Sequence, residues 1–388
     1  MNAVNTFSLG ALALALVACG GDNSSNELSP SPAPVVSPSA EPEAQPSAEP
    51  SVEPSALPSA APSYTPAPVP SPTASPAPSQ VPVESPAPDG SDGFFPTMQG
   101  VNKDAWFYVE ARSDEFNDDV IDTGKWNHNI ADWGPWSWEP DNVWQENNVL
   151  KIQMRYEEHN TARHTWAGDG SLKDVELFYK SGILRSRSYQ TYGYYEARIK
   201  GTATFPGNSP AFWLYSLHAD VAAEGLLPDA DGEPNYAEVD VVELQQSEWD
   251  FDLNQWHGPE VIDMNLHTRV LENNQSLWKR PGTHPELTKN TVHADFDPRD
   301  DFHIYGVEVG EDVISWYLDG VKVAEKANIY WYLPMRVTLS LGLRRPHVSY
   351  NCAGVYQGFD RCPVPSEATQ EGFPTVMEVD WVRVYERN

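Results

Sequence analysis

The sequence predicts an all-β protein, an antiparallel β-sandwich of jelly-roll type. From Trp106 onward, short runs of alternating apolar and polar residues follow one another between turn residues. Almost no segment repeats its apolar residues at the helical spacing of about 3.6 residues. The runs continue to the end of the chain without a low-complexity interruption, which favours one large sandwich over several small domains.

The first element is an apolar run from Phe7 to Ala18, too short to span a bilayer stably, that leads into Cys19. Although no Lys or Arg precedes it, the run resembles a bacterial lipoprotein signal peptide covering residues 1–18. The resemblance implies that the sulfur of Cys19 is acylated, and Gly20 in the next position implies export to the outer membrane. We therefore expect an outer-membrane lipoprotein of the bacterial cell envelope, exposed at the cell surface or secreted.

The second element, residues 19–92, is predicted to be a disordered linker. From residue 29 to about residue 90 it consists almost entirely of Pro, Ser, Ala, Val and Glu, and Tyr64 is its one aromatic residue. Such a composition cannot bury enough apolar surface to offset the entropy of ordering. Extended polyproline conformations at about 3.1 Å per residue would make it a spacer on the order of 200 Å long.

Residues 93–388 form the predicted folded domain. Alternation predicts strands at 149–154, 194–200, 313–318 and 377–385, and the turn Asp319-Gly320 follows the third. A glycine-rich phosphate loop, a Gly-x-Ser-x-Gly elbow and a His-Glu-x-x-His helix are all absent from the sequence. Nucleotide-binding, serine-hydrolase and zinc-protease functions therefore have no support.

The most informative strand is 238–243, in which three acids alternate with three valines. Glu238 and Asp240 share a face, but the third acid is Glu243 and not residue 242. A one-residue β-bulge within Val241-Val242 would return Glu243 to that face. Bulges occur beside active sites because they redirect a side chain.

Three carboxylates on one face repel one another, so they do not stabilise the fold. Their presence indicates a catalytic role. A retaining glycosidase uses one ionised carboxylate as nucleophile and one protonated carboxyl as acid. Neighbouring charges separate the two pKa values. The alternative for such a pattern is a solvated acidic strand or a calcium site.

Cys352 and Cys362 stand in a loop that contains Gly and Pro. An exported protein meets an oxidising compartment, and no cluster of His residues lies near the two thiols in the sequence. We therefore expect a local disulfide in preference to a metal pair.

Several segments resemble glycoside hydrolase family 16, the laminarinase, agarase and κ-carrageenase group, and the extra residue before Glu243 is similar to its bulged branch. They are the acidic strand and the segments 113–117, 193–200 and 210–216. Five more resemble κ-carrageenases in particular: 135–138, 179–182, 278–282, 296–303 and 342–347. The resemblance implies a curved jelly roll with a concave substrate cleft and a retaining endo-hydrolase.

The resemblance also implies a role for each matching residue. Glu238 matches the nucleophile, Asp240 the assisting acid and Glu243 the acid/base. Trp213 matches an aromatic residue in the floor of the cleft, and Gln246 and His267 match polar cleft residues. Trp278 matches a platform on which a sugar stacks, and Arg280 and Arg344 match cations that bind sulfate.

Three further residues keep two interpretations each. Trp136 and Trp138 stand two apart, which suits a sugar platform as well as core packing. Asp380 resembles a residue that helps to bind structural calcium in parts of the family, and is otherwise a surface carboxylate. No cofactor is expected for the chemistry.

An acidic insertion from Asp220 to Tyr236 departs from the family pattern and could reshape an end of the cleft.

The implied reaction is hydrolysis of β-1,4 linkages in κ-carrageenan or in the β/κ hybrid furcellaran, which releases sulfated oligosaccharides. The alternatives are a β-agarase or porphyranase-like hydrolase of agar-type galactans, and a non-catalytic galactan-binding lectin. A net charge of −31 argues against nucleic acid as a partner. A sulfated red-algal galactan remains compatible with that charge, because salt screens global repulsion and local Arg contacts decide binding. We expect a monomer.

The lipoprotein hypothesis predicts the location of one variant. Cys19→Ser removes the sulfur that would be acylated, so the protein should move from the membrane fraction to the soluble fraction of expressing cells. Fractionation followed by immunoblotting measures this. Unchanged membrane association of the variant would rule the hypothesis out.

Overall fold

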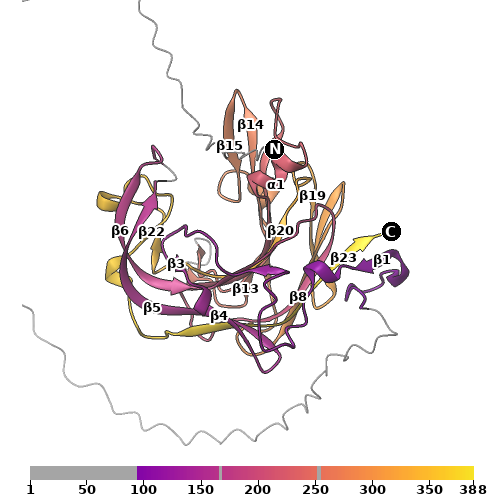
Figure 1. The fold of residues 1–388 in the computed structure, drawn as a ribbon, viewed down its shortest axis with the longest axis horizontal. Coiled ribbons are helices and arrows are strands. Elements are labelled where there is room, and N and C mark those ends of the chain that lie inside the picture. Colours follow the sequence, from indigo (N-terminus) through magenta and orange to yellow (C-terminus); the bar gives the residue numbers. More distant parts are fainter. Residues whose placement is uncertain (1–93, 166–167, 251–254) are drawn as a thin grey trace, which may run out of the picture. The chain divides into compact units, whose positions relative to one another are not determined.

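The computed structural model describes residues 94–165, 168–250 and 255–388. The signal peptide, Cys19 and the linker predicted within residues 1–92 lie outside the described residues. Regular structure in the described part is mostly β (Figure 1), which confirms the predicted fold class. None of the described helices is long and apolar enough to cross a membrane.

The larger sheet has ten strands, and β23 lies near its middle between β8 and β5. Its strands, in spatial order, are β19 (Val321–Ala327), β18 (Val313–Leu318), β17 (His303–Val309), β8 (Gly193–Lys200), β23 (Thr375–Arg387), β5 (Val149–His164), β6 (Leu172–Ser181) and β3 (Ser137–Trp138), with β1 (Trp106–Tyr108) on β23 and β4 (Val143–Glu146) on β5. All pairings are antiparallel except that of β3 with β6.

The second sheet has nine strands and carries the acids on β10. In order these strands are β15 (Gln275–Lys279), β14 (Leu266–Glu272), β10 (Pro234–Glu243), β9 (Asn208–Tyr215), β20 (Arg336–Leu343), β7 (Ile183–Ser186) and β2 (Trp126–Asn127), with β13 (Val261–Asp263) on β10 and β16 (Thr291–His293) on β13. All of its pairings are antiparallel. In Figure 1 the β14–β15 hairpin stands beside α1, and β5 and β6 curve around the opposite side of the view.

The remaining elements of the described residues are short. They are two small sheets, β11 (Trp249–Asp250) with β12 (Gln255–Trp256) and β21 (Val348–Ser349) with β22 (Cys362–Pro363), and two helices, α1 (His218–Ala223) and α2 (Pro285–Thr288). Five single turns of 3₁₀ helix span Lys103–Ala105, Glu110–Arg112, Pro140–Asn142, Gly354–Tyr356 and Pro365–Glu367.

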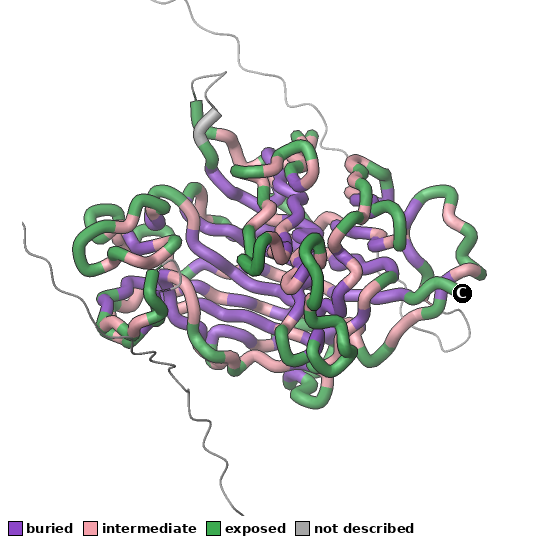
Figure 2. Tube along the Cα trace, turned by 90° about the horizontal axis from the view of Figure 1, so that it is seen from above, coloured by how far each residue is buried: buried purple, intermediate pink, exposed green. Residues whose placement is uncertain are grey.

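The core lies between the two sheets. The apolar residues of alternate positions on β8 and β23, such as Ile199 and Val379, join one buried cluster with Leu214 and Val239 of the second sheet. Figure 2 shows buried residues along the central strands and exposed residues in the connecting loops. The sheet that carries the acids therefore has one face fixed against the core, which leaves its other face for side chains that do chemistry.

The strand predictions hold, and tight turns explain where several strands end. β18 has the predicted bounds, whereas β5 and β23 are longer than predicted. Asp319 and Gly320 have φ of 48° and 77°, the left-handed conformation that a two-residue hairpin turn needs. Cys352 and Cys362 form the predicted disulfide, with 5.8 Å between their Cα atoms.

Candidate active site

The predicted bulge is present on β10. Asp240 pairs with Trp213 of β9, but the next paired residue is Val242 with Phe212, so Val241 is the extra residue. Glu238 and Glu243 pair with Tyr215 and Ala211 of the same strand. Side chains of paired residues share a face. All three acids therefore lie on the face of the second sheet that is turned away from the core.

Two buried indoles hold the main chain of this irregular strand. Nε1 of Trp316 donates to the carbonyl oxygen of Asp240 at 2.9 Å, next to the bulge. Nε1 of Trp331 donates to the carbonyl oxygens of Glu238 and His267 at 2.9 and 3.0 Å. Both indoles thereby satisfy carbonyl groups of the acid-bearing strand and its neighbour. Nothing in the sequence around the two tryptophans indicates this role.

The chain turns sharply after Glu243. Gln245 has a φ of 59°, and its side chain is fully buried. Its amide nitrogen donates to the carbonyl oxygens of Thr202 and Thr204, and its oxygen accepts from the backbone nitrogen of Thr202. These bonds hold a left-handed conformation that a non-glycine residue seldom adopts. The turn brings Gln246 back toward the acids.

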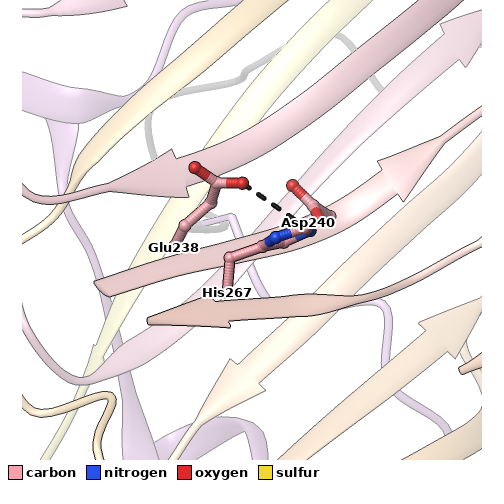
Figure 3. A group of neighbouring side chains, drawn as sticks. All are labelled: Glu238, Asp240 and His267. Atoms are coloured by element: carbon pink, nitrogen blue, oxygen red, sulfur yellow. Dashed lines mark ion pairs between the residues drawn. The ribbon is translucent and has the colours of Figure 1, made fainter. Parts of the chain in front are cut away.

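Glu238, Asp240 and His267 form one charged group (Figure 3). Nε2 of His267, on the neighbouring strand β14, lies 3.3 Å from Oδ2 of Asp240 and 3.8 Å from Oε1 of Glu238. Burial lowers the pKa of His267, but the charges of Glu238 and Asp240 outweigh burial and raise it above its ordinary value. Burial and then the charge of Glu243 raise the pKa of Asp240. An imidazolium therefore sits between two acids at neutral pH.

Tyr236 is a second partner of Glu238 that sequence reasoning missed. Its hydroxyl donates a hydrogen bond to Oε2 of Glu238. Burial, followed by the charge of Glu238, raises the pKa of Tyr236 far above its ordinary value, so the phenol keeps its proton. Tyr236 stands two residues before Glu238 on the same face, and that spacing could have identified it.

Glu243 lies among different partners. Nη2 of Arg344 forms an ion pair with Oε1 of Glu243, and Nε of Arg344 donates to Oε1 of Gln246 at 2.6 Å. Gln246 in turn donates to Oγ of Ser209 at 2.5 Å. Arg344 thus contacts both the acid/base candidate and Gln246, and Arg344 and Gln246 are both predicted to contact substrate. Nη1 of Arg344 donates to the carbonyl oxygen of Leu343.

Asp263 is a fourth acid at this site, also missed from the sequence. It pairs directly with Glu243 across β13 and β10. Burial and then the charge of Glu243 raise the pKa of Asp263 to about 7, and Oγ1 of Thr291 donates to its Oδ1 at 3.1 Å. The position of this acid within the apolar run Val261 to Met264 could have identified it. An acid is seldom buried in such a run unless it has a partner or a function.

The aromatic residues divide into two groups. Trp213 lies opposite Asp240 on the acid-bearing face and stacks on Tyr215, with ring centroids 4.4 Å apart. Trp136 and Trp138 are 1% and 6% exposed and pack edge to face against each other in the core cluster. This burial favours core packing, the other interpretation of their spacing, and their substrate role stays a prediction.

Trp278 and Arg280 lie near Tyr236. The ring of Trp278 packs edge-on to that of Tyr236 at 5.5 Å, and the guanidinium of Arg280 lies 5.5 Å from the Trp278 ring. The guanidinium of Arg269 lies closer, at 4.2 Å. The predicted sugar platform is therefore part of a cationic and aromatic wall that begins beside Glu238.

Two groups of side chains bear on metal binding. Glu238, Asp240 and His267 have ligand atoms within 4.8 Å of one another and could hold a metal ion, although the imidazolium already supplies positive charge there. Asp380 lies on β23, where its Oδ2 is 2.7 Å from Nη1 of Arg198. A calcium ion at Asp380 would compete with this guanidinium, and the calcium role stays a prediction.

A family model described as the GH16 domain of β-porphyranases A to D matches residues 106–387. Among curated relatives, the κ-carrageenase of Pseudoalteromonas carrageenovora is 41% identical over 283 residues, which are 73% of this chain and 65% of the relative. The chain thus spans slightly less than two thirds of that relative. The β-porphyranase B of Zobellia galactanivorans is 24% identical over 72% of this chain and 85% of its own length.

Solved structures agree with the family match. A complex of the P. carrageenovora κ-carrageenase with an oligotetrasaccharide of κ-carrageenan has a TM-score of 0.64 at 41% identity, and covers 73% of this chain and 96% of that one. A κ-carrageenase from Z. galactanivorans has a TM-score of 0.63 at 38% identity, with 76% and 99% covered.

The charged group predicts a titration. The pKa of His267 should lie well above 6.5, and Asp240→Asn should lower it by about one unit or more because one of the two raising charges is removed. NMR titration of the imidazole, assigned by its loss in His267→Gln, measures both values. Asp380→Asn, on the other sheet, is the control and should change nothing. A pKa at or below 6.5 in the parent would contradict this arrangement.

Proposed function

Because this chain belongs to glycoside hydrolase family 16, we propose that it is a retaining endo-hydrolase of β-1,4 linkages in a sulfated galactan, κ-carrageenan or the β/κ hybrid furcellaran. The observation that carries the proposal is the bulge at Val241. It brings Glu243 to the face that already holds Glu238 and Asp240. An unbulged strand would turn Glu243 into the core.

The surroundings of the two outer acids suit different roles. Glu238 receives a hydrogen bond from Tyr236 and lies beside the imidazolium of His267, and both contacts stabilise negative charge on its carboxylate. Glu238 is therefore the nucleophile that attacks the anomeric carbon. Asp240 lies between the charges of Glu238 and Glu243 and holds His267 in place.

Glu243 is the acid/base. It gives a proton to the leaving oxygen while Glu238 bonds to the anomeric carbon, and it then takes a proton from the water that hydrolyses the glycosyl-enzyme. Asp263 faces it with a pKa of about 7, so that a second acidic proton is available near Glu243 close to neutral pH. Two inversions at the same carbon retain its configuration.

The sulfated substrate is supported by similarity and by charge. The relatives with 41% and 38% identity are κ-carrageenases, whereas four porphyranase relatives are 23% to 28% identical. Arg280 lies on the Trp278 wall, where a guanidinium can bind a sulfate ester in a bidentate manner. A porphyranase-like hydrolase of agar-type galactans is the second candidate, because the matching family model covers porphyranases. A lectin would not need Glu238 and Glu243 on one face.

The mechanism predicts both the products and their configuration. The purified protein should release sulfated oligosaccharides from κ-carrageenan and furcellaran but not from agar, and the first-formed reducing ends should be β-anomers. Mass spectrometry identifies the products, and NMR of fresh product identifies the anomer. Glu238→Gln, which keeps the side-chain size but removes the nucleophile, should lower kcat by several orders of magnitude. An α-anomer formed first would exclude retention, and cleavage of agar alone would favour the second candidate.

The contacts of Arg344 and Arg280 predict different effects. Arg344→Ala should lower kcat/KM about 10- to 150-fold on every cleaved galactan, because Arg344 holds Glu243 and Gln246. Arg280→Ala should lower it only on sulfated substrates, because Arg280 contacts the Trp278 wall and no described carboxylate. Steady-state kinetics on κ-carrageenan and on a partly desulfated hybrid measure the difference. Equal losses for Arg280→Ala on both polymers would remove its sulfate role.

A further inference from the structure

A pocket of about 430 Å³ opens beside the nucleophile. It is lined by His218, Leu227, Pro228, Asn235, Tyr236 and Arg269. Tyr236 forms the boundary between this pocket and the acids, since its ring lines the pocket and its hydroxyl binds Glu238. Anything that fills the pocket therefore lies next to the catalytic carboxylates without touching them.

Arg269 is the cation of this pocket, and it lacks an acidic partner among the described residues. Acids outnumber bases 56 to 25 in the chain, and most described arginines pair with a carboxylate, as Arg336 does with Asp220. The guanidinium of Arg269 instead lies over the ring of Trp278, 4.2 Å from its centroid. Its N–H groups make no hydrogen bond to the described part of the chain, so they are free to bind an anion.

The insertion between Asp220 and Tyr236 builds the apolar side of the pocket with Leu227 and Pro228. It is attached to the β14–β15 hairpin, beside which it stands in Figure 1. The backbone nitrogen of Gly232 donates to the carbonyl oxygen of Leu271 at 2.8 Å, and Leu271 donates back to Glu233 at 2.9 Å. The backbone nitrogen of Asn273 donates to Oδ2 of Asp231 at 3.0 Å. These contacts hold the insertion on the hairpin that carries Arg269.

None of the acids of the insertion lines the pocket. Asp220 is held by Nε and Nη2 of Arg336 at 2.6 and 2.8 Å, and Glu233 accepts from the backbone nitrogens of Asp229 and Ala230. The pocket thus combines a free guanidinium, an imidazole and an amide with one apolar wall. A sulfated pyranose has the matching groups, namely an anionic ester, hydroxyls and an apolar ring face.

We propose that this pocket binds a sulfated galactose unit of the polysaccharide, away from the cleaved bond, with Arg269 on the sulfate ester and Leu227 and Pro228 against the sugar ring. The proposal rests on the proposed function, since it deepens the substrate assignment of the same cleft. Because the pocket does not include the reacting groups, its contribution is to affinity for sulfated chains.

Two variants test the proposal, each with a matched control. Arg269→Gln removes the cation, and Leu227→Glu places a carboxylate at the pocket wall. Leu226→Glu adds the same charge to a neighbouring leucine that is 40% exposed, against 42% for Leu227, and does not line the pocket. Arg387→Gln removes an arginine from the other sheet. Circular dichroism and melting temperature show that each variant is folded.

On a sulfated galactan that the parent cleaves, Arg269→Gln and Leu227→Glu should raise KM about tenfold or more, with the loss in KM and not in kcat. Leu226→Glu and Arg387→Gln should keep the parental KM. Calorimetric titration of sulfated oligosaccharides into the Glu238→Gln background should show the same loss of affinity for Arg269→Gln.

Each other outcome is decisive. Parental KM and affinity in both pocket variants would overturn the proposal. An equal rise in KM for a desulfated galactan would show that the pocket does not recognise sulfate. This result would overturn the proposal as well. If the parent protein cleaves no sulfated galactan, the proposed function itself is refuted. The activity of the parent protein is therefore measured before any variant is compared.

Discussion

The mutual repulsion of acids on one strand face is the constraint on which the rest of the site depends. The bulge at Val241 places Glu238, Asp240 and Glu243 on one face, and Asp263 adds a fourth acid opposite Glu243. Burial raises the pKa values of Asp240 and Asp263, so their ionised forms oppose folding, and this cost grows as the pH rises from the unfolded-state pKa toward the folded one. The fold offsets the repulsion with two counter-charges, His267 near Glu238 and Arg344 on Glu243.

The two counter-charges serve different acids of the site. The imidazolium of His267 is shared by Glu238 and Asp240, whereas the guanidinium of Arg344 holds Glu243 and is itself oriented by Gln246. Each partner comes from a different strand or loop, and the strands are held in register by the core on their other face. The indoles of Trp316 and Trp331 support the main chain at the points where the bulge disturbs the ladder. Chemistry on one face therefore depends on packing on the other.

The sequence was sufficient for the parts of the site that obey local periodicity. The alternation of β10 located the acids, and the position of Glu243, one residue out of phase, located the bulge. Partners such as Asp263 and Trp316 come from other strands, and their role depends on a register that no local pattern records. For Trp136 and Trp138 the local spacing was not sufficient. It predicted that the two side chains share a face, but only the folded chain shows that this face is buried. Arg344 likewise matched a substrate residue, and its ion pair with Glu243 joins two segments that are far apart in the sequence.

The proposed binding of a polyanion by a chain of net charge −31 depends on the distribution of its arginines. At physiological ionic strength the field of the whole protein is screened beyond about 8 Å, so an anionic chain responds to the charges that it can touch. Arg198 and Arg383, on the other sheet, are paired with carboxylates. Arg269 and Arg280 lack such partners among the described residues, and both guanidiniums lie near the ring of Trp278. On the proposed function, selectivity for a sulfated chain is a property of this wall and not of the net charge. Because Leu227 and Pro228 of the acidic insertion complete the pocket at Arg269, the most acidic departure of this chain from its family pattern also shapes a cationic pocket.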